Sequence, residues 1–319
     1  MKLVVLERNS VGTDVDVSCF ERFGEVEYYP NTVAENTAER VKDADIVIAN
    51  KAPMNESTLK DAPDVKLICL FATGFDNVDL DYCKSCGIKV ANVVNYSTAA
   101  VVQHTLMLAL ALEEKLAFYD DYVKSDTYAN QDRFSNFDRP FGEFEGKTWG
   151  IVGMGNIGRR VARVAQALGC KVIFYSASGN STCTEYERVE LDTLLAQSDI
   201  LSLHCPLSDR TRGLINKEAF ARMKKSAILV NVARGPVVDT QALYEALTEG
   251  QIAAAGLDVL EKEPISKDNP LGNIKDSTKL IITPHMAWAS TEARERLVSE
   301  VSKNIEAFLG GEDRNIVNK

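Results

Sequence analysis

Basic residues are the minority charge in this sequence, with 36 Lys and Arg against 46 Asp and Glu and a formal net charge of -10. Nucleic acids and anionic lipids are bound by clustered Lys and Arg, so neither is an expected partner. Long apolar runs are also missing, because the longest, near 106–112, is far shorter than the ~18 residues that span a bilayer. Charge returns after the first apolar residues of the chain, so no signal peptide is expected and we predict a cytoplasmic protein.

A disulfide framework is not expected either. The seven cysteines are an odd number with irregular spacing. Cys83 and Cys86 have the spacing of a redox pair, but no second pair completes a zinc site, and both fall in an expected surface helix that ends at Gly87. A redox or metal role for this pair is the alternative to the favoured interpretation, reduced structural thiols. We predict no metal site.

The 319 residues, 45% hydrophobic and 26% charged, have the size and composition of a two-domain globular protein. Short β-branched runs alternate with helical stretches in the first hundred residues, which predicts a parallel sheet covered by helices. The expected strands there are 3–6, 46–49, 67–71 and 90–94. A second series begins at Thr148, with six expected parallel strands at 149–152, 172–175, 200–204, 228–232, 254–259 and 280–283.

Two helices connect these series. Residues 98–128 contain neither Gly nor Pro and predict one long, buried helix between the domains. Residues 290–309 predict an amphipathic helix that returns the chain to the first domain. We therefore predict a discontinuous substrate domain of residues 1–98 and 289–319, and a second domain of residues 99–288.

The segment 130–146 carries four phenylalanines among Asp, Arg, Pro and Gly: Phe134, Phe137, Phe141 and Phe144. It predicts an ordered loop with aromatic anchors. The rings either pack on their own domain or reach a partner subunit, and the sequence leaves both possibilities open.

A glycine-rich loop, Gly153-Met-Gly155-Asn-Ile-Gly158, follows an expected strand and opens an expected helix. Gly153 permits a tight turn, Gly155 a close backbone approach to a pyrophosphate, and Gly158 close packing of helix on strand. The diphosphate would lie at the positive end of the helix. The second domain is therefore predicted to be a Rossmann domain that binds a dinucleotide.

The next strand ends at Tyr175-Ser176 and lacks the acid that usually binds the adenosine ribose. Repulsion against a ribose 2′-phosphate is then lost, yet no nearby Arg or Lys offers that phosphate a partner. We expect NAD, with Ser176 at the ribose, and NADP is not excluded.

Three charged groups follow three expected strands of the second domain, where open α/β sheets place their ligands. They are Arg234, Glu263 and His285. Reduction of a 2-keto acid needs a hydride, a proton for the alkoxide and a cation for the carboxylate. His285 and Arg234 suit the last two needs, and Glu263 would stabilise the imidazolium. His104 and His204 are expected to be structural.

Five segments together resemble the D-isomer-specific 2-hydroxyacid dehydrogenases over essentially the whole chain. They are Ala72-Thr-Gly-Phe-Asp-Asn-Val-Asp79, Gly153 to Gly158, Asn231-Val-Ala-Arg-Gly235, Glu263-Pro264 and Pro284-His285. The runs His285 to Arg294 and Asn95 to Thr98 look closest to the hydroxypyruvate reductase (glycerate dehydrogenase) branch. The resemblance implies an α/β fold of two doubly wound parallel-sheet domains, one flavodoxin-like and one Rossmann domain.

The resemblance also implies the roles of individual residues. Arg234, Glu263 and His285 would be the catalytic trio, and backbone amides near Thr73 and Gly74 would bind the substrate carboxylate. Cofactor contacts are implied for the glycine-rich loop and for Asn156, Ile157, Ser176, Cys205, Pro206, Thr211, Val232, Ala233, Arg234, Asp258 and His285. A homodimer joined through the cofactor domain is implied as well.

The leading hypothesis is therefore reduction of hydroxypyruvate, glyoxylate or a similar short 2-keto acid to the (R)-2-hydroxy acid. One alternative is phosphoglycerate oxidation, which wants basic groups near 71–79, where Lys51 is the nearest candidate. The other is an NADH-sensing interaction module, which would not need Arg234, Glu263 and His285 together.

Overall fold

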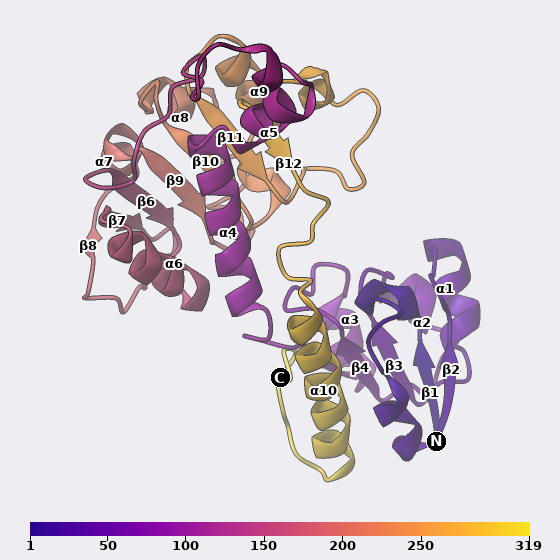
Figure 1. Cartoon of the computed structure of the whole chain (residues 1–319). Coiled ribbons are helices and arrows are strands. Elements are labelled where there is room, and N and C mark those ends of the chain that lie inside the picture. Colours follow the sequence, from indigo (N-terminus) through magenta and orange to yellow (C-terminus); the bar gives the residue numbers. More distant parts are fainter. The chain divides into compact units, whose positions relative to one another are not determined.

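The computed structural model describes all residues from Met1 to Lys319, and they form two compact units (Figure 1). Unit 1 comprises Met1–Ser97 and Trp288–Lys319, and unit 2 comprises Thr98–Ala287. None of the helices is both long and apolar enough to cross a lipid bilayer. Each unit is built around one parallel sheet.

The sheet of unit 1 has the strand order β2-β1-β3-β4-β5, which is the flavodoxin-like order. Its strands are β1 (Lys2–Val5), β2 (Glu25–Tyr28), β3 (Ile46–Ala49), β4 (Leu67–Leu70) and β5 (Lys89–Ala91). All residues of β3 and β4 are buried, as expected for central strands covered on both faces. The edge strand β2 is polar and was not predicted from the sequence.

Helices cover this sheet. They are α1 (Ala34–Val41), α2 (Glu56–Leu59), α3 (Leu80–Ser85) and α10 (Thr291–Leu309), with short 3-10 turns η1 (Arg8–Val11) and η2 (Ser18–Phe23). Ser290 caps α10 by accepting a hydrogen bond from the Ala293 amide, and the helix ends before Gly310. Since α10 contacts β4, the last segment of the chain belongs to the unit that the first segment builds.

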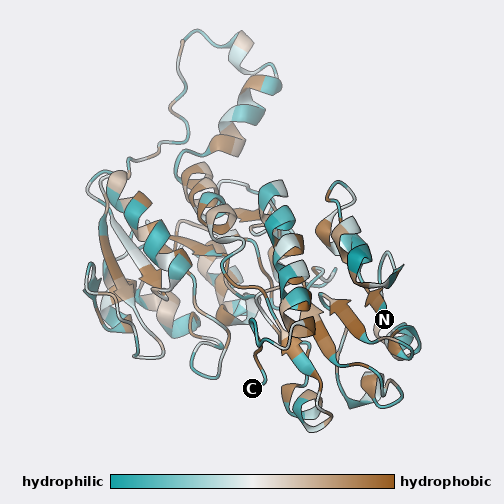
Figure 2. Ribbon diagram, turned by 90° about the horizontal axis from the view of Figure 1, so that it is seen from below, coloured by the Kyte–Doolittle hydropathy of each residue, from teal (hydrophilic) through white to brown (hydrophobic).

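The sheet of unit 2 has seven parallel strands in the order β12-β11-β10-β9-β6-β7-β8. They are β6 (Thr148–Val152), β7 (Lys171–Tyr175), β8 (Glu187–Arg188), β9 (Ile200–Leu203), β10 (Ile228–Asn231), β11 (Ala254–Leu257) and β12 (Leu280–Ile282). The expected six strands are present, and the two-residue edge strand β8 is additional. Figure 2 shows the strands as largely hydrophobic, in keeping with a sheet buried on both faces.

The helices of unit 2 are α4 (Thr98–Glu113), α5 (Leu116–Lys124), α6 (Asn156–Ala167), α7 (Leu191–Gln197), α8 (Lys217–Arg222) and α9 (Thr240–Thr248). Three 3-10 turns complete it: η3 (Tyr128–Asn130), η4 (Gly235–Val237) and η5 (Pro270–Asn273). One helical layer, with α4 and α6, packs on the core that contains Trp149. The opposite core contains Phe220 and Leu243, from α8 and α9.

The expected single helix 98–128 is wrong in one respect, because the chain breaks between α4 and α5. Lys115 has φ 54°, a left-handed conformation that ends α4 and redirects the chain. The α4 side chains Leu108, Ala109 and Leu112 are fully buried, whereas no residue of α5 is. Residues that favour helix continue past Glu113, but the side chains there no longer have a hydrophobic core to pack against.

Helix α5 and the following loop to residue 146 form an arm that projects from the body of unit 2, at the top of Figure 2. Glu113 closes the base of the arm by accepting hydrogen bonds from Lys147 Nζ at 2.6 Å and from the Gly142 amide at 2.9 Å. Phe144 is buried against Trp149, with ring centroids 5.5 Å apart. Phe134, Phe137 and Phe141 are 91%, 71% and 54% exposed, so only one of the four phenylalanines is buried in its own domain, although the Phe141 ring packs edge-on against Tyr119 of α5 with centroids 6.1 Å apart.

Close packing of α4 on the sheet generates a stability prediction. A Cβ at Gly256 would lie 3.0 Å from Leu108 Cβ and 3.2 Å from Leu112 Cδ1. We expect Gly256→Val to lower the free energy of unfolding by about 1–3 kcal/mol through overpacking. Gly272→Ala, where the added carbon meets no atom within 4 Å, should change it by less than about 0.5 kcal/mol. Urea unfolding followed by circular dichroism measures both, and equal stability of the two variants would contradict this packing.

Candidate active site

The glycine-rich loop joins β6 to α6. Gly153 has φ 95°, and a Cβ there would meet the backbone of residues 204–205 at 2.9 Å. A Cβ at Gly158 would lie 2.2 Å from the Gly153 carbonyl oxygen, so helix and turn approach as closely as backbone permits. Gly155 precedes α6, is exposed, and has open space where a Cβ would stand. The first amides of α6, from Asn156 and Ile157, therefore begin at an accessible helix N-terminus.

The remaining predicted cofactor residues lie along the carboxyl ends of neighbouring strands. Ser176 follows β7, Cys205 and Pro206 follow β9, and Val232 and Ala233 follow β10. Thr211 is buried, and its hydroxyl is engaged within its own loop, donating to the Pro206 carbonyl at 2.7 Å and accepting from the Ser208 amide at 2.8 Å. Its side chain therefore shapes the loop after β9.

The expectation that no arginine lies near the end of β7 is wrong. Arg210 donates from Nη1 to the Ser178 carbonyl at 3.3 Å, although it is 32 positions away in the chain. It comes from the loop after β9, which lies two strands from β7 in the sheet, with β6 between them. Arg210 is distant from Ser178 in the sequence, and the order of strands in the sheet brings the two residues together.

Arg234 follows β10 in a turn that its own neighbours hold. Asn231 Oδ1 accepts from the Ala233 amide at 3.0 Å, and Asn231 Nδ2 donates to the Arg234 carbonyl at 3.0 Å. Gly235 then presses against the next strand's loop, since a Cβ there would lie 1.9 Å from the Leu260 carbonyl carbon. The loops after β10 and β11 are thus in backbone contact beside Arg234.

Glu263 and His285 are joined directly. Glu263 Oε2 lies 2.6 Å from His285 Nδ1, and Glu263 Oε1 accepts from the Leu260 amide at 2.9 Å. Their side chains are 33% and 28% exposed, so the pair is partly open to solvent. A carboxylate at Nδ1 fixes the ring so that Nε2 is the atom that can exchange a proton with a ligand. The structure therefore connects the loops that carry Arg234, Glu263 and His285.

Asp258 builds the turn that carries His285. Asp258 is buried, with 2% of its surface exposed. Its carboxylate accepts hydrogen bonds from the Thr283 hydroxyl at 2.6 Å and from the Met286 and Ala287 amides, both at 2.8 Å. Its carbonyl oxygen accepts from the His285 amide at 2.8 Å. His285 itself has φ 53°, a conformation that costs a non-glycine residue free energy and needs such support.

His104, expected to be structural, lies next to this turn. His104 Nε2 is 2.8 Å from Thr283 Oγ1 and 3.5 Å from Asp258 Oδ1. Since the Thr283 hydroxyl donates to Asp258, its oxygen accepts from His104, which requires a proton on Nε2 of that ring. Burial lowers the pKa of His104, against the opposing effect of the Asp258 charge. The sequence analysis assigned no role to Thr283 in this site. The only sequence feature that points to it is its position directly before Pro284-His285.

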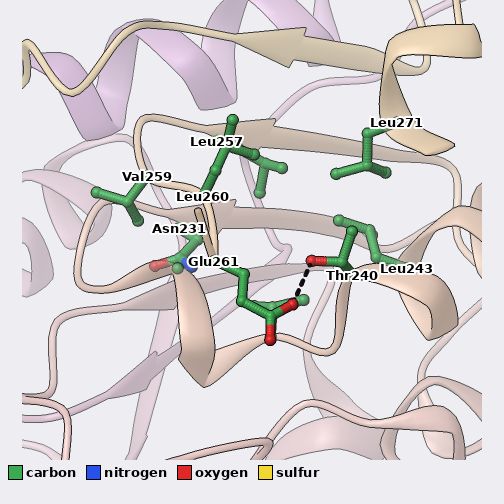
Figure 3. A pocket seen from close by; sticks show the side chains of 10 residues that line it. Asn231, Thr240, Leu243, Leu257, Val259, Leu260, Glu261 and Leu271 are labelled. Atoms are coloured by element: carbon green, nitrogen blue, oxygen red, sulfur yellow. Dashed lines mark hydrogen bonds between the residues drawn. The ribbon is translucent and has the colours of Figure 1, made fainter. Parts of the chain in front are cut away.

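Behind the Arg234 turn lies a cavity of about 10 Å³, lined by Asn231, Gly235, Leu257, Leu260 and Glu261 among others (Figure 3). Among its lining residues, the Thr240 hydroxyl donates to Glu261 at 3.1 Å. The volume suits at most one water molecule. This cavity is therefore a packing feature behind the turn.

Thr73 and Gly74 lie in unit 1, in the loop after β4. The Thr73 hydroxyl donates to the Val93 carbonyl at 2.7 Å, and buried Asn92 donates to the Thr73 carbonyl at 2.7 Å. Asn77 extends the support by donating to the Ala52 carbonyl at 2.7 Å. The loop's shape is thus set by side chains outside it.

Glu7 holds the neighbouring loop of unit 1. Its carboxylate accepts from the amides of Asn50, Lys51 and Ala52 at 2.6 to 3.1 Å. These donors are therefore already bound by an anion that the chain itself supplies. Lys51, the basic residue named above as the nearest candidate for binding a substrate phosphate, is exposed.

No group of three or more His, Cys, Asp or Glu side chains is arranged to hold a metal ion. All seven cysteines are unpaired. Burial raises the pKa of Cys83 to about 11, so that thiol is a weak nucleophile near neutral pH.

Residues 106–287 match the model of the NAD binding domain of the D-isomer specific 2-hydroxyacid dehydrogenases. A domain of this kind, with the site described above, makes the chain an NAD-dependent oxidoreductase.

The chain is 41% identical over 326 residues to the hydroxypyruvate reductase of Blautia hydrogenotrophica, covering 100% of both chains. It is 40% identical over 317 residues to the glycerate dehydrogenase of Methylorubrum extorquens, covering 99% of this chain and 98% of that one. The solved D-lactate dehydrogenase of Aquifex aeolicus, complexed with NAD and lactic acid, superposes with a TM-score of 0.86 at 32% identity, over 100% and 99% of the two chains. The chain belongs to the D-isomer specific 2-hydroxyacid dehydrogenase family.

The buried histidines of unit 2 generate a prediction about pH. Burial lowers the pKa of His204 to about 3 and also lowers that of His104, whereas unfolding restores an ordinary pKa of about 6.5. As pH falls through about 6.5 the unfolded chain binds protons that the folded chain does not, so stability is highest above this pH and decreases below it. Each such histidine contributes a slope of at most about 1.4 kcal/mol per pH unit.

Urea unfolding between pH 7.5 and 5.5 measures this slope. His204→Asn removes one of these two buried histidines and keeps a partner for Ser202, whose hydroxyl lies 3.0 Å from His204 Nε2. We expect a shallower pH dependence in this variant. A slope equal to that of the unchanged protein would contradict the assignment of a neutral, buried His204.

Proposed function

We propose that this chain reduces hydroxypyruvate, glyoxylate or a similar short 2-keto acid to the (R)-2-hydroxy acid with a reduced nicotinamide cofactor. The observation that carries the proposal is the 2.6 Å contact between Glu263 and His285 at the strand ends of the nucleotide domain. The names of the relatives, hydroxypyruvate reductase, glycerate dehydrogenase and glyoxylate reductase, support the substrate class.

His285 is the proposed proton donor. A reduced nicotinamide, when bound, would supply the hydride for the carbonyl carbon. His285 Nε2 would give its proton to the carbonyl oxygen, so that the C=O bond becomes a C–OH bond. The ring is then neutral and is reprotonated from solvent, to which its side chain is 28% exposed. Glu263 holds the ring for this transfer, because its carboxylate contacts Nδ1 and leaves Nε2 for the substrate.

Arg234 is the proposed cation for the substrate. A guanidinium offers paired donors that match a carboxylate and a polarised carbonyl oxygen, and it stays charged at all working pH values. Thr73 and Gly74 are proposed to give backbone amides to the same carboxylate. Together these donors would align the carbonyl carbon for hydride addition.

The proposed cofactor residues are those of the glycine-rich loop and the strand ends. Gly153, Gly155, Asn156, Ile157 and Gly158 would hold the diphosphate, and Ser176, Cys205, Pro206 and Thr211 would lie along the adenosine. Val232, Ala233, Arg234, Asp258 and His285 would surround the nicotinamide. Asp258 Oδ2 accepts only from the Ala287 amide among the described hydrogen bonds, which leaves it capacity to accept a carboxamide N–H.

A steady-state assay of 2-keto acids against NADH and NADPH tests the proposal, with hydroxypyruvate, glyoxylate, pyruvate and 3-phosphoglycerate in the panel. We expect turnover of a short unphosphorylated 2-keto acid. His285→Asn should lower kcat by about 100- to 10,000-fold, because it removes the general acid, while the Kd of the reduced cofactor stays within about threefold.

Two outcomes would overturn this function. Turnover of 3-phosphoglycerate alone would favour the phosphoglycerate alternative. Cofactor binding without turnover of any substrate by the unchanged protein would favour an NADH-sensing module.

We also propose that the chain is a homodimer joined through the arm of unit 2. Six apolar side chains of the arm are 42% to 91% exposed: Leu116, Val123, Tyr128, Phe134, Phe137 and Phe141. Monomers rarely expose so much adjoining apolar surface, and stable dimers bury about 1,200–2,000 Å². The arm is thus the surface best suited to a second copy of the chain.

Analytical ultracentrifugation checks the dimer. The double variant Phe134→Asp and Phe137→Asp should shift it towards monomer, raising the dimer Kd at least tenfold, because two charges would be buried without partners. Val33→Asp, at an apolar position of unit 1 that is 56% exposed, is the matched control and should leave the dimer intact. A double variant that sediments like the unchanged protein would refute the assignment of the interface to the arm.

A further inference from the structure

The loop between β7 and β8, at the ribose end of the proposed dinucleotide site, has no acidic residue directly after the strand. An acid at the end of the second Rossmann strand accepts from the ribose hydroxyls and repels a 2′-phosphate. Here Ser176 occupies that position and is 8% exposed. Its hydroxyl lies 3.5 Å from that of Ser178, so two neutral hydrogen-bonding groups stand where the repelling charge would be.

Three arginines from three different elements surround this loop. Arg210 Nη1 donates to the Ser178 carbonyl at 3.3 Å, and Arg188 Nη1 donates to the Gly179 carbonyl at 2.8 Å. Arg159, at the start of α6, donates from Nη2 to the Thr182 hydroxyl at 3.2 Å. The sheet order explains the convergence, because β9, β6, β7 and β8 are consecutive in the sheet and the loops after the parallel strands β7 and β9 leave it at the same end.

Two of these cations are not neutralised by carboxylates. Arg159 forms an ion pair with Glu185 at 3.4 Å, whereas Arg188 and Arg210 form none within 4 Å. Both are exposed, and each uses one of its five guanidinium N–H donors on a backbone carbonyl. The remaining donors can therefore meet an anion at the rim of the loop.

We propose that Ser176, Ser178 and Arg210, assisted by Arg188, form a subsite for the 2′-phosphate of NADP(H), so that this phosphate raises the chain's affinity for the cofactor. Phosphate oxygens match guanidinium N–H groups and serine hydroxyls, and charge-assisted bonds of this kind are about twice as strong as neutral ones. The proposal rests on the cofactor site assigned above and is independent of the substrate.

The acidity of the whole chain does not oppose this subsite strongly. At physiological ionic strength, charges more than about 8 Å apart at the surface are largely screened. The net charge of -10 is spread over 319 residues, whereas the two unpaired guanidinium groups contact the loop itself. Local cations therefore dominate the potential that a 2′-phosphate meets.

Isothermal titration calorimetry of the full-length protein with two adenosine nucleotides tests the subsite. Adenosine 2′,5′-bisphosphate and adenosine 5′-monophosphate differ only by the 2′-phosphate, so the ratio of their Kd values isolates its contribution. We expect the bisphosphate to bind at least fivefold tighter. Arg210→Gln should remove most of this preference and leave the Kd of the monophosphate within about twofold.

Two further variants complete the design. Ser176→Asp should reverse the preference, because a carboxylate would then face the phosphate. Arg212→Gln is the matched control, since Arg212 is an exposed arginine of the same loop and makes no hydrogen bond to residues 176–182. It should retain the full preference.

Equal affinity of the unchanged protein for both nucleotides would overturn the subsite, as would a preference that survives Arg210→Gln. The outcome is separable from that of the proposed reaction. A protein that prefers the bisphosphate but reduces no 2-keto acid would retain the subsite and lose the function. A protein that reduces a 2-keto acid with NADH but binds both nucleotides equally would retain the proposed function and lose the subsite.

Discussion

The buried carboxylate of Asp258 is the interaction on which the candidate site depends. It ties the end of β11 to the turn after β12 by accepting from Thr283, Met286 and Ala287, and so holds His285 in a left-handed conformation. Burial of a carboxylate without hydrogen-bond partners would strongly destabilise the fold. Three donors at 2.6 to 2.8 Å offset the loss of hydration. The position of the imidazole is thus a consequence of hydrogen bonds that Asp258 makes within two residues on either side of it.

From this anchor the site extends by direct contacts. His285 contacts Glu263, Glu263 binds the Leu260 amide, and the backbone at Leu260 lies against Gly235 beside Arg234. His104 joins the anchor from α4 through Thr283. Each loop therefore limits the positions that its neighbour can adopt, which is the preorganisation that proton transfer and anion binding require.

Much of this arrangement could be predicted from the sequence. Central strands such as β3 and β9 are short apolar runs, and the glycine spacing at 153–158 indicates a turn into a helix, so fold and nucleotide loop follow from local patterns. The order of parallel strands then brings the ends of β10, β11 and β12 together, which is why three distant charged residues could be grouped.

What the sequence did not predict depends on contacts without a local signal. The two-residue strand β8 is too short for a periodic pattern, and the break at Lys115 follows from where the core ends, since helix formers continue beyond it. Arg210 approaches Ser178 only because the loops after β7 and β9 lie two strands apart on one sheet. Thr283 and His104 contact each other although they are 179 positions apart in the chain.

The clasp that Glu113 makes with Lys147 and Gly142 has an evolutionary consequence. Because it closes the base of the arm, the chain between these points can lengthen, shorten or exchange its aromatic residues without disturbing the strands that begin at Thr148. Entropy penalises longer closed segments only weakly. Selection can therefore remodel the outer face of unit 2 and leave the strand ends that carry the candidate site unchanged, so that this surface and the site can diverge independently.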